Sequence, residues 1–231
     1  FNAWSKYKNF SKDNKINSYI SKSLKINNIL PKKLNKKKLN GIVMEGGAFD
    51  INGSGSILLT KECLLSKKQE RNIGYKKIDY EKMFSDYLNI KNFIWLNKGI
   101  VGDDTHGHVD DIARFVSKNT IMTAVESNKS DKNYRYLKEN YEILKRSSNE
   151  KGEKFQILKI PMPSPILIKK TRVPASYLNF FIGNKSVLIP VFKVKEDKKV
   201  VEIFKKFFTN RKVVPVDCRD LIWGFGAIHC M

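Results

Sequence analysis

The chain has 231 residues, of which 41% are hydrophobic and 11% aromatic, enough apolar material for a folded core, which excludes a disordered chain. No apolar run approaches the length that crosses a membrane, so no membrane contact is predicted. The formal net charge of +21 is typical of a nucleic-acid-binding protein. However, only seven of the 44 basic residues are arginine, and the lysines are spread along the whole chain. We therefore favour a basic surface composition and expect no specific nucleic-acid partner.

Three cysteines are too few for a disulfide framework and fit a reducing compartment, which predicts a cytoplasmic location. Cys63 and Cys218 stand in apolar surroundings and are expected in the core. Cys230 is different because it follows Gly224 and Gly226 in the run GFGAIHC. A thiol in such a run is either a small core residue or a nucleophile on a tight loop.

The first predicted element is an amphipathic helix with Ile16, Tyr19, Ile20 and Leu24 on one face, which resembles the helix of an earlier, partial unit. It is followed by the lysine-rich run PKKLNKKKLN at residues 31–40, which we interpret as a solvated linker.

Three successive units come next, each predicted as two strands, a helix and a third strand. The predicted strands are 42–51, 56–60 and 93–96, then 111–116, 120–125 and 155–160, then 177–183, 186–192 and 212–216. The helix of each unit carries its apolar residues on one face: Tyr80, Met83, Phe84, Tyr87 and Leu88; Tyr134, Leu137, Tyr141 and Leu144; Val201, Phe204, Phe207 and Phe208. One such unit buries little by itself, so we expect the units to pack together as one α/β domain.

Polar residues interrupt the strand pattern at the same place in each unit, namely Glu45, the His108 and Asp110 pair, and Asn179. In an extended segment His108 and Asp110 would share one face, where two polar groups could act on one substrate. Each residue also has a structural alternative: a turn for Glu45, surface polarity or a metal-ligand pair for His-x-Asp, and a strand amide for Asn179. His106 and His108 lack a third ligand at zinc spacing, so no metal site is predicted.

Four ordered segments give the chain a resemblance to a known family. EGGAFDINGSGSILLTKECLLS, DDTHGHVDDIARFV, SYLNFFIGNKSVLIPVF and VDCRDLIWGFGAIHC resemble, in order and spacing, the agmatine deiminase and bacterial peptidyl-arginine deiminase family of the guanidine-modifying superfamily. The opening FNAW is also similar to a family segment. The resemblance implies a pentein fold, a pseudo-symmetric α/β propeller of five ββαβ units. About three and a half of those units would be present, as a single incomplete domain over residues 1–231.

The resemblance also implies the catalytic residues. Cys230 corresponds to the nucleophile that attacks the guanidinium carbon, and His108 to the general acid/base. Asp110 corresponds to a carboxylate that grips the guanidinium nitrogens, and Glu45 to the acidic partner of the histidine. The planar cation of a guanidinium calls for carboxylates to bind it and a soft nucleophile to attack its carbon.

Three further positions concern substrate binding. Asn179 matches an asparagine of the family motif and is expected at the substrate. Asp104 stands where the family usually has a longer glutamate, and His106 stands where it usually has aspartate, so these two departures bear on recognition of the substrate tail. A second guanidinium-binding aspartate, carried in the family by an upstream segment, is absent here. The chain is therefore expected to be a fragment that is inactive by itself.

Together these inferences predict a hydrolase that converts agmatine to N-carbamoylputrescine and ammonia through a covalent thiouronium on Cys230, with no cofactor. Peptidyl-arginine deimination is the nearest alternative, and a basic nucleic-acid-binding module that uses the lysine cluster at 32–38 is an alternative of another class. A homo-oligomer is left open.

Overall fold

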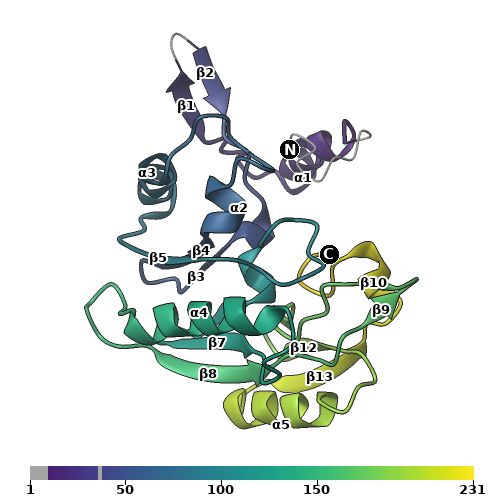
Figure 1. The fold of residues 1–231 in the computed structure, drawn as a ribbon. Helices are drawn as coiled ribbons and strands as arrows, with labels where there is room; N and C mark the ends of the chain where they lie inside the picture. The colour runs from purple at the N-terminus through teal and green to yellow at the C-terminus, as the bar shows by residue number, and fades with distance from the viewer. Residues whose placement is uncertain (1–9, 36–37) are drawn as a thin grey trace.

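The computed structural model describes residues 10–35 and 38–231 (Figure 1). Near the N-terminus, the 3₁₀ helix η1 (Asp13–Lys15) leads into α1 (Ile16–Leu24), as the amphipathic pattern predicted. The apolar face of α1 is not covered by the described residues, since Ile16, Tyr19, Ile20 and Leu24 are all exposed.

The run at 31–40 is not the linker that the lysine cluster suggested. Strands β1 (Lys32–Asn35) and β2 (Lys38–Gly41) pair antiparallel, with Lys32 opposite Gly41 and Asn35 opposite Lys38. A charged run does not prevent pairing, because the hydrogen bonds of a ladder come from the backbone and lysine is common on exposed strands. The hairpin projects from the rest of the molecule (Figure 1).

The three predicted ββαβ units are confirmed. Each forms a three-stranded sheet in which the first two strands pair antiparallel and the last two pair parallel around a crossover helix. The first unit consists of β3 (Phe49–Ile51), β4 (Ser56–Thr60), α2 (Lys61–Leu65), α3 (Lys77–Leu88) and β5 (Asn92–Leu96); the second of β6 (Ala113–Ser117), β7 (Thr120–Val125), α4 (Asn133–Arg146) and β8 (Gln156–Pro161); the third of β11 (Phe181–Ile182), β12 (Ser186–Val191), α5 (Asp197–Phe207) and β13 (Lys212–Asp217). The short pair β9 (Leu167–Ile168) and β10 (Thr171–Arg172) links the second unit to the third.

The first strand of each unit is shorter than predicted. Only 49–51 of the predicted 42–51 is a strand, because residues 46–48 form the 3₁₀ helix η2 (Gly46–Ala48). In the second unit η3 (Val109–Asp111) precedes β6, and in the third only Phe181–Ile182 of 177–183 is paired. The segments that carry the polar residues therefore fold as loops and 3₁₀ turns, which allows their side chains to meet.

The central strand β4 shows how the first unit is joined to the others. All five of its residues are buried. Ile57 and Leu59 pack in one hydrophobic cluster with Tyr80 and Phe84 of α3, whereas Leu58 belongs to the cluster that runs through the second and third units. The alternation follows from the two-residue period of a strand that is covered on both faces.

A buried ion pair also joins the units. Asp50 of β3 accepts hydrogen bonds from Arg114 Nε at 2.9 Å and from the backbone N–H of Phe115 at 2.6 Å. Arg114 Nη1 in turn donates to the carbonyl oxygens of Leu178 and Phe180, at 3.3 and 3.1 Å. One arginine thus holds the segment that carries Asn179 against the first two units. None of the helices among the described residues is long and apolar enough to span a membrane.

Candidate active site

Cys230 lies on a loop that glycine makes possible. The 3₁₀ helix η4 (Leu221–Gly224) ends at Phe225, whose φ of 60° is left-handed, and the chain then folds back on itself. A Cβ atom added at Gly226 would lie 2.6 Å from Cys230 Cβ and 3.1 Å from its sulfur, so a side chain there would displace the thiol. Gly224, in contrast, faces open space. The glycine run is therefore a tight turn that presents a thiol, and Cys230 is exposed whereas Cys63 and Cys218 are buried.

The buried side chain of Asn179 fixes this loop. Its Oδ1 accepts hydrogen bonds from the backbone N–H groups of Ala227, His229 and Cys230, at 3.1, 3.0 and 3.3 Å. Its Nδ2 lies 3.1 Å from Cys230 Sγ and 3.1 Å from Asp110 Oδ2. Both ends of the amide are thus engaged by the protein, and they hold the thiol next to a carboxylate.

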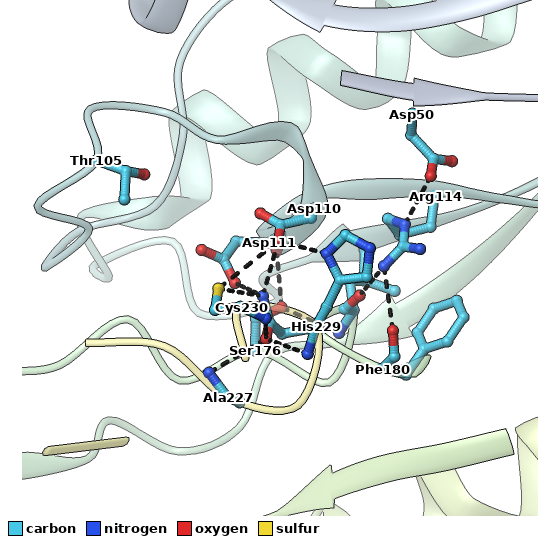
Figure 2. A network of polar contacts seen from close by, with 12 residues as sticks. Asp50, Thr105, Asp110, Asp111, Arg114, Ser176, Phe180, Ala227, His229 and Cys230 are labelled. Atoms are coloured by element: carbon cyan, nitrogen blue, oxygen red, sulfur yellow. Dashed lines mark hydrogen bonds and ion pairs between the residues drawn. The ribbon is translucent and has the colours of Figure 1, made fainter. Parts of the chain in front are cut away.

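Asp110 is the carboxylate at the centre of the network. It lies in η3, is completely buried, and has His229 Nδ1 at 2.8 Å and Cys230 Sγ at 3.7 Å from its Oδ2 (Figure 2). Burial by itself raises the pKa of Asp110, but the contact with His229 and the positive charges of His108, His229 and Arg114 lower it overall. Asp110 is therefore held as an anion.

The adjacent Asp111 behaves in the opposite way. Its Oδ1 lies 3.1 Å from Asn179 Nδ2, and its backbone carbonyl accepts a 2.7 Å hydrogen bond from Ser176 Oγ. Burial, followed by repulsion from Asp110 and Asp103, raises the pKa of Asp111 well above its ordinary value. The pKa values of the two neighbouring carboxyl groups are thus shifted in opposite directions, and both groups lie close to the thiol.

His108 is paired with Glu45. The two side chains are buried, and His108 Nε2 lies 3.9 Å from Glu45 Oε2. Burial by itself lowers the pKa of His108, but contacts with the Cys63 and Glu45 side chains and the nearby Asp110 raise it well above 6.5. Burial raises the pKa of Glu45, whereas His108 and Arg71 lower it overall. The pair is therefore an imidazolium beside a carboxylate.

Gly47 leaves room for the side chains of His108 and Asp110 to lie close together. A Cβ atom at this position would lie 2.6 Å from His108 Nδ1 and 2.9 Å from Asp110 Oδ2. Contacts under 3.0 Å do not occur for real Cβ atoms, so any other residue at position 47 would displace His108 or Asp110. Glycine leaves room for both side chains. The second glycine of the EGG motif is thus explained by the side chains around it.

The thiol of Cys230 is protonated in this environment. Although the residue as a whole is exposed, its sulfur packs against Asn179 and Asp110. Its burial among these groups, followed by the charges of Asp110 and Asp111, raises the pKa of Cys230 far above that of an ordinary thiol. A cation placed beside Asp110 would act in the opposite direction.

The structure brings together four of the predicted residues, Glu45, His108, Asp110 and Cys230, with Asn179 between two of them. The reason given for one pair was wrong: His108 and Asp110 do not share a face of an extended strand, because His108 precedes the 3₁₀ turn that contains Asp110. The turn directs His108 towards Glu45 and Asp110 towards Cys230 and His229.

The loop before His108 contains the other two predicted positions. Asp104 is half-buried in this loop, and His106 adopts a left-handed φ of 57°. The neighbouring Asp103, which the sequence did not single out, holds the loop, since its carboxylate accepts from the backbone N–H groups of Thr105, Gly107 and His108 at 2.8, 2.7 and 3.1 Å. The part of Asp104 in binding the substrate tail stays a prediction.

Several residues of the site were missed from the sequence. His229 was overlooked although it directly precedes Cys230. Arg71 lies in no motif that suggested a function, yet its Nε is 3.3 Å from Glu45 Oε1. Cys63 is buried as expected, but its sulfur also lies near Glu45 and His108. These contacts join distant parts of the chain and have no local pattern.

The fold and the site, compared with solved structures, define a class of protein. Three ββαβ units whose loops bring a cysteine, a histidine and two carboxylates together form the α/β pentein fold. The family model of the Porphyromonas-type peptidyl-arginine deiminases matches residues 1–231, and the chain belongs to that family.

Individual relatives agree with this assignment. A Latilactobacillus sakei protein assigned as an agmatine deiminase is 37% identical over 212 residues, which cover 84% of this chain and 58% of the relative. A variant of the C. jejuni agmatine deiminase, solved with substrate bound, is 31% identical with a TM-score of 0.85, and the match covers 100% of this chain and 65% of that one. An Enterococcus faecalis agmatine deiminase is 26% identical with a TM-score of 0.87, covering 100% and 66%. The chain thus spans between about a half and two-thirds of the length of these relatives.

Proposed function

We propose that the protein containing these residues is a deiminase of small guanidines that converts agmatine to N-carbamoylputrescine and ammonia. The observation that carries the proposal is the position of the exposed Cys230 thiol 3.7 Å from the buried, anionic Asp110, with the protonated His108 facing the same region. Relatives named as agmatine deiminases, one of them solved with substrate bound, support agmatine as the substrate.

Substrate binding would rest on charge. A guanidinium group is a planar cation with N–H donors at fixed angles, and a carboxylate can accept two of them in parallel. Asp110 is ionised and points at the thiol, so a guanidinium bound to it would have its carbon beside Cys230 Sγ. His229 Nδ1 contacts Oδ2, the oxygen of Asp110 that also faces the thiol, and would act as a positioning residue for the carboxylate.

Asp110 would also make the ionisation of the Cys230 thiol depend on bound substrate. In the free protein, burial and Asp110 raise the pKa of Cys230. A bound guanidinium neutralises Asp110 and adds a positive charge next to the sulfur, so both changes favour the thiolate. The thiol would therefore ionise when substrate arrives, losing its proton to solvent because His108 is already protonated, and until then it stays unreactive towards other electrophiles.

The reaction would proceed in two halves. The Cys230 thiolate attacks the guanidinium carbon and forms a C–S bond, and His108, whose raised pKa keeps it protonated, gives its proton to the departing amine as the C–N bond breaks and ammonia leaves. Neutral His108 then takes a proton from water, whose oxygen attacks the S-alkylthiouronium carbon. The C–S bond breaks, a ureido product forms, and Cys230 is released. Glu45 would hold the imidazolium in place between these steps.

Asn179 and Asp104 have different parts in this scheme. All contacts of the Asn179 amide described above are with the protein, so we propose that it positions the Cys230 loop, in place of the direct substrate binding that the family motif implied. Asp104, on the loop next to the site, is proposed to act on the substrate tail.

We also infer that the three units belong to a closed propeller of five, of which this chain holds about three and a half. The repeated strand order and the convergence of loops from all three units on one site support this arrangement. A crystal structure of the full-length natural protein would count the units, and an open arrangement or another number would contradict the inference.

The family name favours one competing substrate, a peptidyl arginine. The test is to incubate the full-length natural protein with agmatine and, separately, with an arginine-containing peptide, and to measure ammonia and the ureido product. We expect turnover of agmatine that the Cys230→Ala variant lacks. Preferred turnover of the peptide would replace the substrate, and binding of agmatine without any reaction would refute the proposed activity.

A further inference from the structure

A second cluster of reactive side chains includes His108 together with a cysteine other than the proposed nucleophile. Glu45, Cys63 and His108 each direct one donor atom into it, and the three donor atoms all lie within 4.8 Å of one another. Cys63 is completely buried, and the side chains of His108 and Glu45 are 7% and 11% exposed. The catalytic scheme uses His108 and Glu45 but assigns nothing to the Cys63 thiol.

The positions of the three donors are fixed by contacts that do not involve the donor atoms themselves. Thr60 caps α2 by accepting from the backbone N–H of Cys63 at 3.2 Å, and the same hydroxyl donates to the carbonyl oxygen of Gly107, directly before His108. Cys63 and His108 are thus attached to one side chain. The backbone N–H of His108 is held separately by Asp103.

Arg71 fixes the third donor. Its Nη1 donates to the carbonyl oxygens of Cys63 and Gln69, at 3.2 and 3.1 Å, and its Nη2 donates to that of Thr105. Its Nε contacts Glu45 Oε1 and leaves Oε2 directed towards His108. Glu45 Oε2 is buried and has no hydrogen-bond partner among residues 10–35 and 38–231, although it is a charged oxygen. His108 Nε2 lies 3.9 Å from this oxygen, beyond hydrogen-bond distance, and a metal ion bound between the two would give the buried oxygen the direct contact that it lacks.

We propose that Glu45, Cys63 and His108 bind a divalent transition metal of the zinc class. One thiolate, one imidazole and one carboxylate oxygen form a donor set that zinc accepts, with a water molecule as fourth ligand. Zinc–ligand bonds of about 2.0–2.3 Å place tetrahedral donor atoms roughly 3.5 Å apart, so donors within 4.8 Å of one another must close by at most about 1.3 Å. Since Arg71 occupies Oε1, Glu45 would bind through one oxygen.

The consequence is a reversible block of the enzyme, and this part rests on the proposed function. A metal bound to His108 removes the nitrogen lone pair and the proton that the acid/base steps require, so the metal-bound and catalytic states exclude each other. The sequence predicted no metal because no third ligand stands near the two histidines. In the proposed site only one of these histidines, His108, is a ligand, and Glu45 and Cys63 supply the other two donors.

The test uses Co²⁺ as a coloured substitute for zinc, added to the full-length natural protein. We expect a thiolate-to-cobalt absorption band that one equivalent of Zn²⁺ abolishes. The band should persist in Cys230→Ser and Cys218→Ser, the matched control variants, and disappear in Cys63→Ser. A band that survives in Cys63→Ser, or disappears in Cys230→Ser, would overturn the proposed site.

A second variant covers the case in which Cys63→Ser does not fold, as judged by circular dichroism. Glu45→Gln keeps the thiolate and removes only one charged oxygen ligand, so the band should remain while Co²⁺ affinity falls at least about tenfold. An unchanged affinity would exclude Glu45 as a ligand and refute the proposal. The spectroscopic result does not depend on deiminase activity. If agmatine is not a substrate, only the inhibition by Zn²⁺ loses its meaning, whereas the site itself is still tested.

Discussion

Replacing Asp110 by asparagine should have opposite effects on the Cys230 thiol and on turnover. The carboxylate oxygen lies 3.7 Å from the sulfur, and its negative charge disfavours a second negative charge there. Asp110→Asn removes that charge and keeps the shape of the side chain. The pKa of Cys230 should therefore fall, while activity on agmatine should be abolished because Asp110 is the carboxylate proposed to bind the guanidinium group.

The size of the effect follows from the distance. Two unit charges 3.7 Å apart repel each other by ~1 kcal/mol at an effective dielectric constant of ~80 and by ~4.5 kcal/mol at ~20. One pKa unit corresponds to about 1.4 kcal/mol, so the pKa of Cys230 should fall by about 1 to 3 units. The exposed position of Cys230 places the expected value near the lower end.

The assay is the rate of Cys230 alkylation by iodoacetamide as a function of pH, with the modified residue located by mass spectrometry. Only Cys230 should react in the folded protein, because Cys63 and Cys218 are buried. Asp86→Asn is the charge-matched control, since Asp86 is an exposed carboxylate on α3 that pairs with Lys82. An alkylation midpoint in Asp110→Asn that is unchanged, or higher than in the parent, would refute the reasoning.

Three further variants test the site and the fold. Gly47→Ala should reduce agmatine turnover by on the order of 10²-fold, because the added methyl would lie 2.6 Å from His108 Nδ1. Gly46→Ala is the control, since a Cβ atom there meets nothing within 4 Å. Equal activity of the two variants would contradict the steric explanation. Asp50→Ala should lower the free energy of unfolding by about 3–5 kcal/mol in a urea titration, because it leaves the Arg114 charge buried and without its carboxylate partner. A loss below about 1 kcal/mol would show that this ion pair does not join the units. Asn179→Ala should reduce kcat more than it raises KM for agmatine, and a change in KM alone would restore the direct substrate role.

The elements of the fold could be predicted because they depend on local patterns. Period-two strands and one-sided helices identified three ββαβ units, and the NGSG turn forms as expected, with Asn52 Oδ1 accepting from the backbone N–H groups of Ser54 and Ser56 at 2.9 Å each. The predicted bounds of the strands were wrong where polar residues had been assigned to a strand. Glu45 and Asn179 lie in loops, because a side chain that must reach a shared centre cannot remain on a sheet face.

The residues of the site could be predicted from the sequence only in part, because many of their contacts are not local. The family motif led to Cys230, His108, Asp110 and Glu45, but the residues that set their charge come from elsewhere in the chain. Arg71 acts on Glu45 through a loop that no periodicity describes. Long-range contacts of this kind are a property of the folded chain and leave no local signal.

The central claim is that Cys230 forms a covalent bond to the guanidinium carbon of agmatine. The most direct measurement is intact-protein mass spectrometry after the full-length protein is mixed with agmatine and quenched with acid during turnover. We expect an adduct whose mass is that of agmatine less ammonia, located on the Cys230 peptide and absent from Cys230→Ala. Turnover without such an adduct, or with the adduct on Cys63, would contradict it.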